Sequence, residues 1–89
     1  MNIKKEQEEQ IVNFGVFDYD SKKIASILGV DKKIIDNEFL EKDSRLNLLI
    51  LKGKNISDYV IDLKLFDLAK TGDLKALDKL DERKKNRKF

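Results

Sequence analysis

Hydrophobic residues recur at intervals of three and four along most of the chain, which is the spacing of amphipathic helices. The first segment with this pattern covers residues 2–14. Gly15 then interrupts the pattern, and Val16-Phe17 have the character of a buried connector. We therefore predict a first helix that ends before Gly15.

Two short helices are predicted next, over about Ser21–Leu28 and Lys32–Glu41, with Gly29 between them. The turn from Asp18 to Ser21 and Asp31 can cap their N-termini, because short polar side chains accept hydrogen bonds from the free amides there. In the second of these helices we expect three apolar residues to form the inner side: Ile34, Ile35 and Phe39.

A long helix is predicted over Arg45–Lys70, capped by Asp43 or Ser44. Its apolar stripe is interrupted at residues 52–55, around Gly53. The interruption is compatible with a kink, with the close approach of a partner backbone, or with a division of the helix in two.

The segment Thr71-Gly72-Asp73 ends one helix and starts the next. Glycine suits the left-handed position that closes a helix, and aspartate suits the N-cap that follows. The last helix is predicted over Leu74–Lys85. So short a turn implies that the last two helices form an antiparallel hairpin, and the predicted fold class is all-α.

Composition narrows the function classes. The chain has 89 residues, no Cys, no His and no Pro, and 40% of its residues are charged. Without thiols or imidazoles, and without a phosphate-binding loop or metal-ligand spacing, we expect no enzyme, no cofactor and no metal. The longest apolar run, Leu48–Leu51, is too short to cross a membrane, and no signal peptide begins the chain. These features predict a cytoplasmic protein.

Residues 21–40 match the pattern of a helix-turn-helix unit. A small residue stands where the helices would cross, and a glycine four positions later suits positive φ in the turn. Apolar residues stand before the turn, after it and inside the second helix. One position departs from the pattern, since Glu38 occupies a late core place and Phe39 lies beside it. The residues that define the unit are Ala25, Gly29, Val30 and Ile35.

Such a unit predicts double-stranded DNA as a partner, with the helix from Lys32 entering the major groove. Lysine reaches guanine acceptors or phosphates, and asparagine pairs with adenine. The alternative is an ordinary helical corner that binds no ligand. The predicted DNA-binding residues are Lys22, Lys23, Lys32, Lys33, Asp36 and Asn37.

The stripe of the long helix predicts self-association. A helix of this length extends about 40 Å, which is more than a small three-helix head can cover, and uncovered apolar surface favours assembly. The alternative is that the first helix folds back over the stripe within a monomer. The predicted oligomerisation residues are Leu46, Leu49, Ile56, Tyr59, Val60, Leu63 and Phe66.

Basic residues without acids end the chain. Such a cluster can contact phosphates, or it can be a solvated helix end whose cations suit the helix dipole. The predicted organisation is a helix-turn-helix unit at 1–42, an oligomerisation hairpin at 43–82 and a basic tail at 83–89, with Arg83, Lys84, Lys85, Arg87 and Lys88.

The segment Asp62–Leu77, placed after a helix-turn-helix unit, resembles phage terminase small subunits and related homeodomain-like phage proteins. The resemblance extends over about residues 14–83 and also includes several shorter strings: Phe14-Gly15-Val16-Phe17, Lys23–Leu28, Glu38-Phe39, Gly53-Lys54 and Asp58-Tyr59.

This resemblance implies a role in viral genome packaging. Residues 21–40 would recognise viral DNA, residues 44–82 would form a ring of copies, and the basic tail would contact DNA or the large terminase subunit, which carries the enzymatic activities. Two alternatives remain from the residues themselves. One is a phage or bacterial transcription regulator, commonly a dimer on a palindromic site, and the other is a protein-interaction module that binds no DNA.

Overall fold

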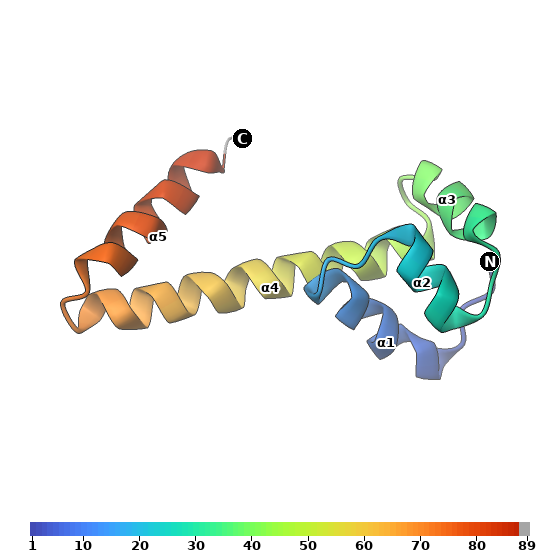
Figure 1. Cartoon of the computed structure of the whole chain (residues 1–89), viewed down its shortest axis with the longest axis horizontal. Coiled ribbons are helices and arrows are strands. Elements are labelled where there is room, and N and C mark those ends of the chain that lie inside the picture. Colours follow the sequence, from blue (N-terminus) through green and yellow to red (C-terminus); the bar gives the residue numbers. More distant parts are fainter. Residues whose placement is uncertain (88–89) are drawn as a thin grey trace. The chain divides into compact units, whose positions relative to one another are not determined.

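The computed structural model describes residues 1–87, which are all-helical without a strand (Figure 1). The predicted all-α class is therefore confirmed. The chain divides into two compact units, residues 1–57 and 58–89, so the division lies inside the long helix rather than at residue 42. The helices are α1 (Lys5–Val16), α2 (Ser21–Leu28), α3 (Lys32–Leu40), α4 (Arg45–Lys70) and α5 (Leu74–Asn86).

Side-chain caps explain why four of the helices begin where they do. The Asp20 carboxylate accepts from the Lys23 amide at 2.9 Å, and Asp31 and Asp73 do the same at the starts of α3 and α5. The Ser44 hydroxyl accepts from the Asn47 amide at 3.1 Å, so of the two candidates it is Ser44 that caps α4. Each cap satisfies an amide that has no partner within its helix.

The predicted end of the first helix is wrong, because α1 continues through Gly15 to Val16. Phe17 is 60% exposed and is not a buried connector. Gly15 is required for packing rather than for a turn. A Cβ placed there would overlap the backbone of Ile50 and lie 3.1 Å from the Gly53 Cα.

The interruption of the apolar stripe at Gly53 has the same cause, the close packing of the two helix backbones. A Cβ on Gly53 would overlap the Val12 carbonyl oxygen and lie 2.9 Å from the Gly15 Cα. Of the three alternatives, close backbone approach is therefore the one that holds, and the approaching backbone is that of α1 in the same chain. The α4 helix remains continuous through Gly53.

The core of the first unit joins α1, α2 and α3 to the start of α4. Leu46 and Leu49 are 0% and 6% exposed within it, so they are unavailable to a second copy and their prediction as oligomerisation residues is corrected. This first part of the stripe is covered as the monomer alternative had suggested. The buried side chains are Ile11, Phe14, Ile24, Ala25, Ile35, Leu46, Leu49 and Ile50.

The end of α3 is tied to the start of α4 by polar contacts. The Asn47 side-chain Nδ2 donates to the carbonyl oxygens of Glu38 at 3.0 Å, Phe39 at 3.2 Å and Glu41 at 2.7 Å. The Ser44 hydroxyl also donates to the Glu38 carbonyl. These bonds add donors to carbonyls at the end of the helix, where partners within the helix are few. Phe39 packs against the core, although the helix-turn-helix pattern puts its late core position at Glu38.

In the second unit, α5 runs back along the end of α4, as the short turn predicts. Gly72 has φ +96° in that turn. The Arg83 side chain donates to Asp62 at 2.6 Å and to Asp58 at 3.2 Å, and Arg87 also pairs with Asp62. The predicted tail is corrected accordingly, because residues 83–86 are helical. Lys88 lies outside the described residues.

Replacing Gly53 by alanine tests the helix crossing. Alanine ordinarily stabilises a helix interior by about 1 kcal/mol over glycine, but here we expect Gly53→Ala to lower the free energy of unfolding by about 1–3 kcal/mol, as overpacking does. Urea unfolding followed by circular dichroism measures the change. Asn55→Ala, at an exposed position of the same helix, should be neutral or slightly stabilising. A Gly53→Ala protein at least as stable as wild type would contradict the crossing.

Candidate nucleic-acid interface and assembly face

The turn between α2 and α3 has the geometry that its residues predict. Gly29 ends α2 with φ 70° and ψ 33°, the left-handed region, and its amide donates to the Ala25 carbonyl. The Val30 amide donates to the same carbonyl at 3.1 Å. Ala25 is 5% exposed, and Val30 is half-buried against the core. Three residues therefore suffice to reverse the chain between two packed helices.

The predicted recognition residues separate into two groups. The Lys32 ammonium pairs with the Asp36 carboxylate at 2.8 Å, and this contact, followed by one from Ser21, holds the pKa of Asp36 below its usual value. The positive charge of Lys32 is thus partly compensated. Lys33 and Asn37 are exposed one turn apart, and their side chains make no hydrogen bond or ion pair with any other residue in the described range 1–87.

The expectation that Ile34 lies on the inner side of α3 is wrong. Ile35 is 0% exposed and Ile34 is 42% exposed. Successive helical residues differ by about 100° in direction, because a turn takes 3.6 residues, so only one of two adjacent isoleucines can face the core. The exposed part of α3 therefore carries an apolar side chain next to Asn37, three residues away on the helix, which the sequence pattern alone did not reveal.

Lys22 and Lys23 stand exposed near the start of α2. The Lys23 ammonium lies 4.5 Å from the centre of the Tyr19 ring, a cation–π distance that gives the lysine a preferred position. The first unit as a whole, residues 1–57, contains equal numbers of basic and acidic side chains. Any attraction of this unit for phosphates must therefore be local to these lysines.

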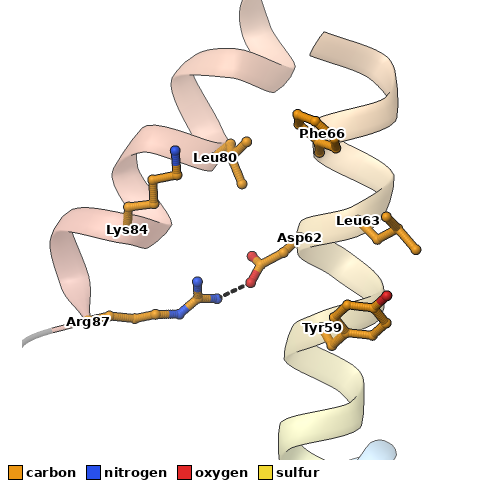
Figure 2. A pocket seen from close by; sticks show the side chains of 7 residues that line it. All are labelled: Tyr59, Asp62, Leu63, Phe66, Leu80, Lys84 and Arg87. Atoms are coloured by element: carbon orange, nitrogen blue, oxygen red, sulfur yellow. Dashed lines mark hydrogen bonds and ion pairs between the residues drawn. The ribbon is translucent and has the colours of Figure 1, made fainter. Parts of the chain in front are cut away.

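A second surface, which we call the hairpin face, lies between α4 and α5 in the second unit. It is a groove of about 300 Å³ lined by Tyr59, Leu63 and Phe66 from α4 and by Leu80 from α5, with Lys84 and Arg87 at its rim. Figure 2 shows these side chains and the Asp62–Arg87 pair between the two helices. An apolar groove with a charged rim is the usual form of a protein-docking surface.

The exposed fractions of these side chains show how much apolar surface is available. Leu80 is 8% exposed and forms the floor, whereas Tyr59 is 64%, Phe66 49% and Leu63 43% exposed. The predicted oligomerisation residues Val60 and Ile56 are also exposed, at 56% and 40%. The later part of the predicted stripe is thus uncovered by the described residues.

The hairpin face depends on the ion pairs of Asp62. Arg83 is the main cause that lowers the pKa of Asp62, and Asp62 in turn raises the pKa of Arg83. Arg83 and Arg87 therefore hold α5 on α4 instead of forming a free basic surface. Lys84 and Lys85 remain exposed.

Two other kinds of feature are absent from residues 1–87. This part of the chain contains no cluster of three or more side chains suited to hold a metal ion. It also contains no helix with the length and apolar character needed to span a membrane.

Comparison with known proteins adds no relative. No protein-family model, curated protein sequence or solved structure matches the chain. The assignment of a function therefore rests on the residues described above.

Acid should weaken the contact between α5 and α4. Because the folded-state pKa of Asp62 is lowered, its ion pairs stabilise the fold above the unfolded value near 3.8, and this stability is lost as the pH falls through the lower folded value. We expect the urea midpoint to drop more between pH 7 and pH 3 in wild type than in Asp62→Asn. Asp67→Asn, which loses only an exposed pair with Lys70, serves as the control. Equal acid sensitivity in wild type and Asp62→Asn would contradict this role.

Proposed function

We propose that this chain is a non-catalytic protein that binds double-stranded DNA, with α2 and α3 acting as a helix-turn-helix unit. The observation that supports this proposal best is the exposure of polar side chains on the outer side of α3. A three-residue turn through Gly29 joins α2 to α3, whose inner side packs on the core, while the side chains of Lys33 and Asn37 form no hydrogen bond or ion pair within the part of the chain that the structure describes.

Each exposed polar residue has a chemical role in this proposal. Asn37 can make a bidentate contact to adenine, and Lys33 can reach a guanine acceptor or a phosphate. To Lys22 and Lys23, which are exposed near the start of the preceding helix, we assign contacts to the DNA backbone, the kind of contact that fixes register. Lys32 contributes less, because Asp36 competes for its charge.

Self-association through the hairpin face is the second part of the proposal. Exposed aromatic and aliphatic side chains of this size favour burial by about 1.5–3 kcal/mol each when fully covered. Binding by a single copy is weak because the first unit is electrically balanced. Several linked copies bind a duplex much more tightly than one copy does.

For the biological role we propose an adaptor in phage genome packaging, which recognises viral DNA and recruits the large terminase subunit. The resemblance of residues 62–77 to terminase small subunits supports this role. A transcription regulator would use the same α2–α3 surface. A packaging ring requires many copies, whereas a regulator is commonly a dimer, so the copy number in solution discriminates between the two roles.

Removal of Lys33 tests the recognition helix. We expect Lys33→Ala to weaken binding to a labelled duplex by about 5–10-fold and to reduce the salt slope by about 1, because one phosphate or base contact is lost. Lys32→Ala should have a smaller effect, since Asp36 already compensates its charge. Lys52→Ala, exposed on α4, is the matched control and should bind like wild type. Fluorescence anisotropy at two salt concentrations measures all four proteins, and identical affinities would remove the assignment.

A charge placed in the hairpin face tests assembly. We expect Leu63→Lys to lower the copy number seen by native mass spectrometry, because a buried unpaired ammonium is costly. Ile61→Lys is a closely matched control, since Ile61 and Leu63 are both 43% exposed but Ile61 does not line the groove. Assembly that survives Leu63→Lys, or that is lost equally in both variants, would exclude this face as the contact.

A further inference from the structure

The outer side of α3 carries an exposed isoleucine where a DNA-binding helix meets base edges. Ile34 is 42% exposed, and the adjacent Ile35 is fully buried. Ile34 follows Lys33 directly and stands three residues before Asn37, a spacing that makes side chains neighbours on a helix surface. An apolar group thus lies beside the carboxamide of Asn37, which makes no side-chain hydrogen bond within residues 1–87.

The major groove offers an isoleucine one favourable partner. Base edges there present hydrogen-bond donors and acceptors, and the thymine 5-methyl group is the apolar exception. Packing Ile34 against a guanine or cytosine edge would remove water from polar atoms without replacing their hydrogen bonds. An isoleucine at this place therefore favours thymine.

An A·T base pair also offers hydrogen-bond partners to the side chain of Asn37. Its carboxamide donates to N7 and accepts from the N6 amino group of adenine. Asn37 has both groups free within residues 1–87, since no side-chain hydrogen bond engages it there. Isoleucine and asparagine one turn apart therefore select the same kind of base pair by independent contacts.

The charge balance gives these contacts a large share of the binding energy. Residues 1–57 carry no net charge, and Lys32 is paired with Asp36. The sequence-independent attraction to phosphates is correspondingly small. Discrimination between DNA sequences then depends on the contacts that α3 makes with base edges in the major groove.

From these observations we infer that the outer face of α3 reads A·T base pairs, with Ile34 packed on a thymine methyl group and Asn37 bonded to adenine. The inference rests on the proposed DNA-binding function and deepens it, since it names the class of sequence that the protein recognises.

The experiment removes the apolar group from each side of the contact in turn: the methyl group of thymine, and the side chain of Ile34 beyond Cβ. Duplexes are selected from a random pool with the full chain, and the preferred duplex is resynthesised with single thymines replaced by deoxyuridine. At one position we expect binding to weaken about 4-fold, the value of one buried methyl group. Ile34→Ala should lose the discrimination between thymine and deoxyuridine at that position, because the partner of the methyl group is gone.

Ile27→Ala is the matched control. Ile27 is 44% exposed, nearly the same as Ile34, but it stands on α2. We expect Ile27→Ala to retain the full ratio between the thymine and deoxyuridine duplexes. Circular dichroism of both variants verifies that each protein remains folded.

The outcomes separate the inference from the proposed function. Selected duplexes that bind equally well with deoxyuridine at every position, or Ile34→Ala that keeps the ratio, would overturn the reading of thymine while DNA binding stands. A pool that the protein does not retain at all would overturn both, whereas a retained pool in which no sequence is enriched would overturn the reading of thymine alone. Enrichment of G·C pairs at the contacted positions would likewise refute the inference.

Discussion

Contact between the backbones of α1 and α4 at Gly15 and Gly53 is the constraint on which the first unit depends. Neither glycine leaves room for a Cβ, since an added atom would meet the backbone of the other helix. This close crossing brings Ile11 and Phe14 against Leu46 and the start of α4. The core that results is the platform against which α2 and α3 pack. The position of the proposed DNA-binding surface is therefore set by two residues that take no part in binding.

Polar contacts then decide how α3 is presented. The side chains of Asn47 and Ser44 donate to carbonyls at its end, so the helix is held to α4 by hydrogen bonds as well as by Ile35 and Phe39. Holding α3 by one side leaves the opposite side to solvent. On the exposed side are Ile34 and two side chains that form no hydrogen bond or ion pair within residues 1–87, Lys33 and Asn37, and the proposed readout of DNA depends on these three.

In the second unit, the basic residues of α5 form ion pairs with α4, which a count of basic residues does not show. Arg83 and Arg87 neutralise Asp62, and Arg83 also contacts Asp58. These pairs hold α5 along α4 and so create the groove whose floor is Leu80. Cations assigned to a terminal tail thus become part of a proposed assembly surface, with Lys84 at its rim.

Local signals in the sequence determined the helices. The caps at Asp20, Asp31 and Asp73 and the positive-φ residues Gly29 and Gly72 act on their nearest neighbours, so short-range pattern was enough to predict α2 to α5 closely. Only the tertiary structure showed that Gly15 and Gly53 lie at a helix crossing, that Ile34 is exposed and that Arg83 pairs with Asp62 and Asp58. Each of these depends on which residue from a distant part of the chain, or which side of a helix, lies opposite. Helical periodicity predicts which residues form a helix, but it does not predict which distant residues their side chains contact.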